Sequence, residues 1–239
     1  MELLIVLVEA KIPENIGFVA RVMKNFGFKS LCLYKCNLNE KSYITASHAK
    51  DVLNNAIILN NKREFDELLS KCNLIVCTTG VSSSDEKYLR KPTFKPNEIK
   101  VVGKTAILFG REDFGLLNEE LERCHIVVTI PTSEEYPVMN ISHAVAIILY
   151  EISKNYRECD KDFATSKDIE VLITNIEDML KSTWYPKHRI RKTMMAFRRV
   201  FGRAMLTRRE VLTLNGVFRK TKRYIEKLRK DNLKTNKKI

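Results

Sequence analysis

The segment TAILFGREDFGLLNEELERCHIVVTIPTSEEYPVMNISH, residues 105–143, decides the fold. It contains two short apolar runs, Ala106–Phe109 and Ile126–Ile130, of which the first ends before a glycine and the second before a proline. Between them, Asn118–Arg123 is predicted to form a short helix. Strands that alternate with helices are typical of a parallel sheet, and we expect these two strands to be neighbours in it. The loops that follow them then leave from the carboxyl edge of the sheet, where open α/β sheets bind ligands.

The two loops carry residues suited to a binding site. Gly110 and Gly115 permit positive φ angles or a close approach of the backbone to a ligand. Arg111, Glu112 and Asn140 bring two charges and an amide to the same rim. The pattern therefore predicts one ligand site at this edge of the sheet.

The chain before residue 105 repeats the same alternation. Leu3–Val8 is a continuous apolar run, typical of a parallel strand that is buried on both faces. A helix is predicted from Pro13 to Phe26, with Gly27 as its C-cap. We read residues 81–100, which contain two prolines, as a surface loop. Further strands are predicted at 31–34, 56–59 and 74–78, and further helices at 47–54, 62–71 and 142–153. The fold class is thus α/β with a parallel sheet.

A smaller helical region is predicted to follow. Residues 156–165 are polar and are interpreted as a linker between residues 1–155 and residues 166–239. Amphipathic or basic helices are predicted at 169–180, 188–205 and 207–229. Thr207 and Glu210 have the spacing of a capping box at the start of the last helix, and the last ten residues are expected to fray.

Charge is segregated along the chain. The formal net charge is +13, yet residues 1–159 contain 20 Lys and Arg against 20 Asp and Glu. Residues 160–239 contain 22 basic and 9 acidic residues, and from residue 181 onward the numbers are 20 and 3. Such an excess indicates a polyanionic partner, RNA or DNA. A membrane surface is the alternative, but no stretch is long and apolar enough to span a bilayer.

Several other function classes lack support in the sequence. The six cysteines form no CxxC pair, so buried free thiols are favoured over a zinc site. The four histidines have no metal-ligand spacing, and neither a GxGxxG nor a GxxxxGK[ST] motif is present. The first apolar run is too short for a signal peptide, so we expect a cytoplasmic protein without a metal.

Three blocks stand in order: KIPENIGFVARVMKNFG (residues 11–27), LFGREDFGLLNEEL (108–121) and IPTSEEYPVMNISHAVA (130–146). They resemble the three motifs of the SPOUT RNA ribose 2′-O-methyltransferases, in the SpoU/TrmH branch and closest to the TrmJ-type tRNA enzymes. The resemblance covers residues 3 to about 155. The basic stretch RAMLTRREVLTLNGVFR (203–219) also looks like the C-terminal helices of TrmJ-type enzymes.

The resemblance implies a deep trefoil knot in the carboxyl-terminal part of the sheet domain, a rare exception to unknotted folding. It also implies a homodimer whose site is completed across the interface, and S-adenosylmethionine bound in the knot. The residues that would hold this cofactor, largely through backbone groups, are Thr78, Thr79, Gly80, Gly110, Ile130, Val138, Met139 and Asn140.

The same resemblance places Arg21, Asn15, Glu112 and Asn140 in the catalytic site. Spacing alone would make Arg21 a solvated helix residue. A guanidinium has a pKa above ~12 and is a poor base, so we favour a role for Arg21 in binding phosphate and stabilising the developing oxyanion. Removal of the proton by Arg21 itself is the alternative. The family often has a serine where this chain has Val138, so one hydroxyl is missing from the third motif.

The basic helices are expected to bind the substrate, a tRNA methylated in its anticodon loop, two nucleotides before the anticodon. Alternatives are ribosomal RNA as substrate, or a knotted RNA-binding protein that has lost catalysis. Trp184 and Tyr185 either stack on a base or pack in the core, and core packing is favoured. The predicted RNA contacts are Arg189, Arg191, Lys192, Arg198, Arg199, Arg203, Arg208 and Arg209.

Overall fold

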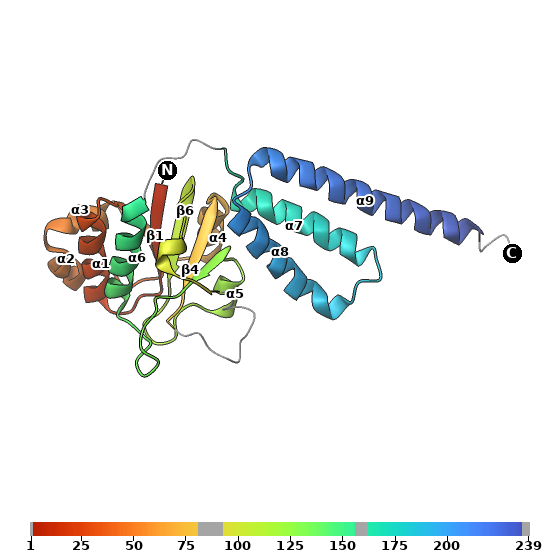
Figure 1. Cartoon of the computed structure of the whole chain (residues 1–239). Helices are drawn as coiled ribbons and strands as arrows, with labels where there is room; N and C mark the ends of the chain where they lie inside the picture. The colour runs from red at the N-terminus through yellow and green to blue at the C-terminus, as the bar shows by residue number, and fades with distance from the viewer. Residues whose placement is uncertain (1, 81–92, 156–161, 236–239) are drawn as a thin grey trace.

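The computed structural model describes residues 2–80, 93–155 and 162–235. Within them a seven-stranded parallel sheet is covered by helices on both faces, and three further helices extend away from one side of this α/β unit (Figure 1). The predicted α/β class with a parallel sheet is confirmed.

The order of the strands corrects one prediction. The sheet runs β3-β2-β1-β6-β4-β7-β5, so the two strands of the opening segment are not neighbours. Strand β4 lies between them, and Cys77 is paired with Leu108 on one side and Val127 on the other. A short strand also lies within the predicted loop at 81–100, of which residues 81–92 are outside the described residues. The strands are β1 Glu2–Val8, β2 Ser30–Tyr34, β3 Ile57–Leu59, β4 Leu74–Thr78, β5 Thr93–Phe94, β6 Lys104–Phe109 and β7 Ile126–Val128.

The helices around the sheet include one that the sequence analysis missed. Helix α2 begins after Asn39, whose side chain accepts a hydrogen bond from the backbone of Lys41. It packs so closely on α1 that a Cβ at Gly17 would lie 2.2 Å from the carbonyl oxygen of Ser42. Gly17 of the first motif is therefore a packing glycine. The helices are α1 Pro13–Asn25, α2 Glu40–Ala46, α3 Lys50–Asn54, α4 Lys62–Ser70, α5 Asn118–Leu121 and α6 Ile141–Asn155, with 3₁₀ turns at Ser47–Ala49 and Pro96–Glu98.

Both faces of the sheet are buried. On β1, Leu3, Ile5 and Leu7 join the core beneath α1 and α6, whereas the alternate residues join the core beneath α4 and α5. Side chains of a strand alternate between the two faces, so a strand with two cores is apolar throughout. This explains why the first strand shows no polar alternation.

Three helices form a second, smaller unit with its own apolar cluster. They are α7 Ser166–Lys181, α8 Ile190–Ala204, preceded by a 3₁₀ turn Lys187–Arg189, and α9 Arg208–Thr235. Leu172, Ile176 and Met194 are buried between them. The predicted capping box of Thr207 and Glu210 is confirmed by hydrogen bonds in both directions.

The helical unit is docked on the α/β unit rather than tethered by a free chain. The side-chain amide of Asn73 donates hydrogen bonds to the carbonyl oxygens of Phe163 at 2.9 Å and Ala164 at 3.1 Å. On α8, a Cβ at Gly202 would lie 2.3 Å from the Cβ of His125, which shows how closely the helix approaches the sheet. Ala164 is buried, so the end of the predicted linker is packed. Its residues 156–161 lie outside the described residues.

The cysteines differ in part from the prediction. Cys77 and Cys124 form a disulfide, so these two are not the free thiols that we expected. Cys32, Cys36 and Cys72 are free, and Cys159 is outside the described residues. Among residues 2–80, 93–155 and 162–235, no helix has the length and apolar character needed to cross a bilayer, and no group of three His, Cys, Asp or Glu residues is arranged to hold a metal.

Candidate functional site

A pocket of about 680 Å³ lies at the carboxyl edge of the sheet. It is formed by the loops after three adjacent strands, β6, β4 and β7, and by the beginnings of α1 and α6. Its apolar lining includes Phe109, Val128, Ile130 and Ile148. The insertion of β4 between β6 and β7 therefore makes three loops converge where we expected two.

A chain of hydrogen bonds joins all three motifs inside this pocket. The hydroxyl and backbone N–H of Ser142 donate to Oδ1 of Asn140 at 2.7 and 2.9 Å. Nδ2 of Asn140 donates to Oδ1 of Asn15 at 2.9 Å, and Nδ2 of Asn15 donates to Oε1 of Glu112 at 3.1 Å. Every donor points toward the carboxylate, so each amide has one defined orientation. Asn15 is thereby fixed relative to Glu112, 97 positions away in the chain, and to Asn140, 125 positions away.

The Glu112 carboxylate is held further by the backbone at the start of α1. Its oxygens accept hydrogen bonds from the backbone N–H groups of Lys11 at 3.1 Å and Ile12 at 3.2 Å. Ionised acceptors form the stronger class of hydrogen bonds, and an acidic group near a helix N-terminus is favoured by the helix dipole. Glu112 therefore links the loop after β6 to α1.

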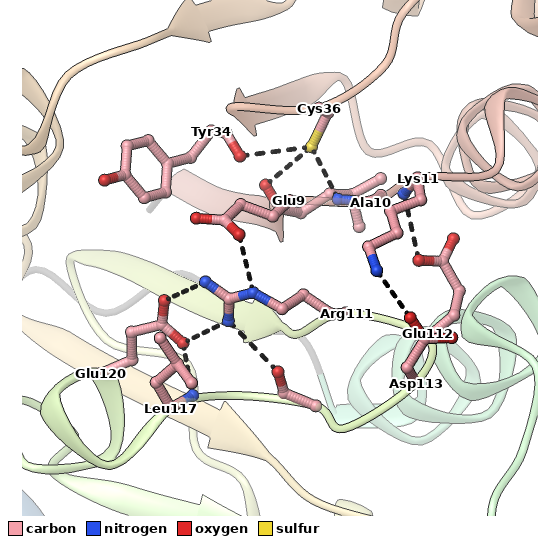
Figure 2. A network of polar contacts seen from close by, with 12 residues as sticks. Glu9, Ala10, Lys11, Tyr34, Cys36, Arg111, Glu112, Asp113, Leu117 and Glu120 are labelled. Carbon is pink, nitrogen blue, oxygen red and sulfur yellow. Dashed lines mark hydrogen bonds and ion pairs between the residues drawn. The ribbon is translucent and has the colours of Figure 1, made fainter.

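Arg111 lines the pocket, as predicted for the rim, but its guanidinium is already paired with two carboxylates of the protein. Figure 2 shows its guanidinium between two carboxylates from different elements. Nη1 and Nη2 both lie 3.0 Å from Glu120 oxygens, and Nε lies 2.9 Å from Glu9. Its side chain is only 2% exposed. Burial lowers the pKa of the Arg111 guanidinium, but the hydrogen bonds to Glu120 and Glu9 outweigh this effect and raise that pKa overall. Arg111 is thus a clasp for the loop that carries Glu112.

Two glycines shape the same loop, as the sequence indicated. A Cβ at Gly110 would lie 2.2 Å from the backbone carbon of Gly115, which has a φ of +74°. The backbone N–H of Arg111 and the carbonyl of Gly115 are joined at 3.2 Å, and the reverse pair at 2.9 Å. The loop is therefore a closed turn with little freedom. Farther along the pocket, a Cβ at Gly80 would lie 3.6 Å from Cα of Val138, so the third loop crosses the end of β4.

Most of the predicted site residues meet in this pocket. Asn15, Glu112 and Asn140 line it together, whereas Arg21 is exposed on α1 and does not line it. The sequence analysis missed Glu9, Glu120 and Ser142. Glu120 and Ser142 have a sequence signal, because each lies within one of the three blocks, whereas Glu9 lies outside them. The residues predicted to hold the cofactor all line the pocket, namely Thr78, Thr79, Gly80, Gly110, Ile130, Val138, Met139 and Asn140.

Some of the predicted RNA contacts are buried or already contact other protein groups, and the others are exposed. Arg199 is buried, and burial lowers its pKa, so we withdraw it as a surface contact. Arg198 is occupied by Glu170, with Nε 2.6 Å and Nη2 2.8 Å from its two carboxylate oxygens. Arg191 is exposed and pairs with Glu122. Arg203 is half-buried, with its guanidinium carbon 5.9 Å from the centre of a phenylalanine ring. The remaining contacts are exposed, namely Arg189, Lys192, Arg208 and Arg209.

The two aromatic residues in the turn between α7 and α8 also differ from the prediction. Trp184 is 99% exposed, so the favoured interpretation of core packing is wrong for this residue. Tyr185 is half-buried, and its hydroxyl lies 2.6 Å from that of Thr193.

The pocket at the carboxyl edge of a parallel sheet and the attached basic helical unit are typical of an α/β protein that binds a small ligand and a nucleic acid. The model of the SpoU rRNA Methylase family matches residues 2–150. The chain belongs to this family.

Individual relatives match nearly the whole chain. A tRNA (cytidine-2′-O-)-methyltransferase TrmJ from Methanocaldococcus jannaschii is 38% identical over 90% of this chain and 97% of its own length. An uncharacterized tRNA/rRNA methyltransferase from Haemophilus influenzae is 31% identical over 95% of this chain and 98% of its own length. The crystal structure of TrmJ from Z. mobilis is similar to this chain, with a TM-score of 0.71 and 27% sequence identity. The match covers 91% of this chain and 98% of the Z. mobilis chain.

Proposed function

We propose that the chain is a tRNA ribose 2′-O-methyltransferase that uses S-adenosylmethionine. The observation that carries the proposal is the hydrogen-bonded set of Asn15, Glu112 and Asn140 inside one pocket. Membership of the SpoU family supports methyl transfer to RNA, and the name of the Methanocaldococcus relative supports tRNA as the substrate and ribose as the acceptor.

The pocket suits the cofactor in size and chemistry. Its volume of about 680 Å³ lies within the ordinary range for small-molecule sites. Apolar walls at Phe109, Ile130 and Ile148 accept a flat heterocycle, while Gly80 and Gly110 line the pocket without side chains. When bound, S-adenosylmethionine supplies an electrophilic methyl group on a sulfonium.

The protein's own residues then have mainly to position the acceptor. A ribose hydroxyl must approach the methyl carbon in line, and holding two reactants in such a geometry is itself a large part of catalysis. The fixed amides of Asn15 and Asn140 define one wall of that approach. We assign Arg21 to the phosphate beside the ribose and to the developing oxyanion. We expect Arg21→Ala to reduce methyl transfer by roughly 10²–10³-fold, as the loss of a transition-state donor does, with cofactor affinity unchanged.

We assign Arg21 to the pocket of a second copy of the chain. It is exposed on α1 and absent from the pocket of its own chain. Phe18, three residues earlier on the same side of α1, is 40% exposed, and an exposed aromatic side chain beside a catalytic cation suits a subunit interface. The active form is therefore a homodimer in which the partner's Arg21 completes each site.

Mixed dimers test this arrangement directly. Arg21→Ala and Glu112→Ala chains are co-expressed with different tags, and the mixed dimer is purified by both tags. If Arg21 acts across the interface, one pocket of the mixed dimer retains every catalytic residue and about half of the wild-type activity returns. If Arg21 acts within its own chain, both pockets are damaged and the mixed dimer is as inactive as either parent dimer.

The knot and the division of the chain belong to the same proposal. The close passage of the third loop at Gly80 supports a trefoil knot in which the chain after β7 is threaded. We assign residues 1–155 to the catalytic domain, 156–165 to the connection and 166–239 to RNA binding, in a protein of the cytoplasm. The excess of 17 positive charges from residue 181 onward supports the RNA-binding assignment.

The substrate is tested by incubating the protein and a methyl-labelled cofactor with tRNA or with rRNA. Mass spectrometry of the nucleosides then identifies any 2′-O-methylated residue, which we expect in the anticodon loop of tRNA. Label in rRNA alone would favour the alternative substrate that the name of the Haemophilus relative includes. Failure to bind the cofactor in calorimetry would favour a protein that only binds RNA.

A further inference from the structure

The turn between α7 and α8 holds a tryptophan out in solvent. Trp184 is the only tryptophan of the chain and is 99% exposed. The turn itself is well ordered by hydrogen bonds: the Thr183 hydroxyl donates to the carbonyl of Leu180 at 2.7 Å, and the backbone N–H of Tyr185 donates to that hydroxyl at 3.2 Å. Tyr185 is anchored in turn on Thr193 of α8. The neighbours of Trp184 are therefore fixed, whereas its large apolar side chain contributes no burial to the fold.

A second pocket, of about 800 Å³, opens beside this turn. The residues on either side of Trp184 in the chain line it, and so do Ile190, Met194 and Met195 of α8. This pocket shares no residue with the pocket at the sheet, and the turn lies at the end of the helical unit that points away from the sheet (Figure 1).

Charge at this second pocket is predominantly positive. Four cations and two carboxylates line it. Glu177 pairs with Lys181 at 2.6 Å and Glu122 pairs with Arg191, so both carboxylates are already engaged. In the part of the chain that the structure describes, no carboxylate pairs with Lys187, which is exposed three residues after Trp184. An anionic ligand therefore finds an available cation next to an available aromatic face.

We propose that Trp184 and this second pocket bind an unpaired nucleotide of the RNA, away from the ribose that is methylated. The base stacks on Trp184 and the neighbouring phosphate pairs with Lys187. Aromatic faces and cations arranged along one groove are what single-stranded nucleic acid requires. A protein partner is disfavoured because the excess of basic residues from residue 181 onward attracts the uniformly negative phosphate backbone more strongly than a protein surface of mixed charge. The proposal rests on the proposed function, since it assumes that the substrate is RNA.

Binding at Trp184 can be followed by its intrinsic fluorescence, because Trp184 is the single tryptophan of the sequence. Because Trp184 is 99% exposed, we expect acrylamide to quench this fluorescence strongly in the free protein. Addition of unmodified tRNA is expected to shift the emission and protect it from acrylamide. Stacking on one base corresponds to roughly a 5- to 100-fold change in affinity. Trp184→Ala is therefore expected to raise KM for tRNA by that factor, with kcat and cofactor affinity unchanged. Trp184→Phe keeps an aromatic face and retains most of the affinity.

Matched variants separate stacking from general effects. Val171→Ala removes a half-exposed apolar side chain of α7 and should leave KM for tRNA unchanged. Lys187→Gln removes one phosphate contact, so the dependence of log affinity on log salt should become shallower by about 0.7 to 0.9. Thermal unfolding of each variant checks that the fold is retained.

Two results would overturn the proposal. One is saturating tRNA that leaves both the emission of Trp184 and its acrylamide quenching unchanged. The other is an emission that changes with protein concentration in the absence of RNA, because Trp184 would then lie between copies of the chain. If tRNA protects Trp184 but receives no methyl group, the nucleotide site stands and the proposed methyl transfer fails.

Discussion

Removal of Glu120 is the sharpest test of the ion pairs by which Arg111 holds the loop that carries Glu112 (Figure 2). In Glu120→Leu, the guanidinium loses both of its 3.0 Å contacts to that carboxylate and faces only Glu9 and the carbonyl of Gly115. The Arg111 side chain is 2% exposed, so water does not replace the lost contacts. The variant thus leaves the buried guanidinium of Arg111 paired with one carboxylate in place of two.

The magnitude follows from this burial. Breaking a buried ion pair by removal of one partner typically costs about 3–5 kcal/mol. Glu9 still compensates part of the charge, so we expect a loss near the lower limit, about 3 kcal/mol in the free energy of unfolding. The double variant Arg111→Met/Glu120→Leu has no buried charge and fills similar volume, and should unfold within about 1.5 kcal/mol of the wild type.

Urea unfolding at pH 7 measures these differences, and methyl transfer measured on the same samples separates stability from positioning. Because the clasp holds the loop that carries Glu112, we expect the stable double variant to remain slow in methyl transfer. Glu9→Gln is the control, with a smaller loss than Glu120→Leu, since the Glu9 side chain is 34% exposed. A loss below about 1 kcal/mol in Glu120→Leu, or a double variant as unstable as the single one, would refute the buried-charge argument.

Three further predictions concern the pH dependence and two glycines. Burial lowers the pKa of His125 to about 4, so the folded protein takes up a proton at His125 less readily than the unfolded chain does. The free energy of unfolding therefore falls by about 3 kcal/mol as the pH decreases from 6.5 to 4. Urea unfolding at both pH values should show less of this loss in His125→Leu. Gly110→Ala forces the loop away from Gly115, and calorimetry should show cofactor affinity reduced by about tenfold or more. Gly17→Ala pushes α2 from α1, and should cost about 1–3 kcal/mol in urea unfolding while cofactor affinity is unchanged.

Much of the fold was accessible from the sequence because it depends on local patterns. The run at Leu3–Val8 has no polar alternation, and only a strand covered on both faces allows this. Gly110 and Gly115 indicated positive φ angles or a close backbone approach, and the structure has a φ of +74° at Gly115 and a close approach of Gly110 to Gly115. Family membership was also accessible, since the three motifs are short and lie in fixed order. Helix α2 was missed because its apolar side chains are few and partly exposed, so no periodic stripe marks it.

The sequence by itself determined the parallel α/β class, the three motif loops and the concentration of positive charge after residue 181. Only the tertiary structure decided that β4 separates the two strands of the opening segment and that Arg111 and Arg199 are buried, whereas Trp184 is exposed. The physical reason is that burial and pairing depend on partners far away in the chain. Glu9 lies 102 residues before Arg111, and no local pattern around either residue records that contact.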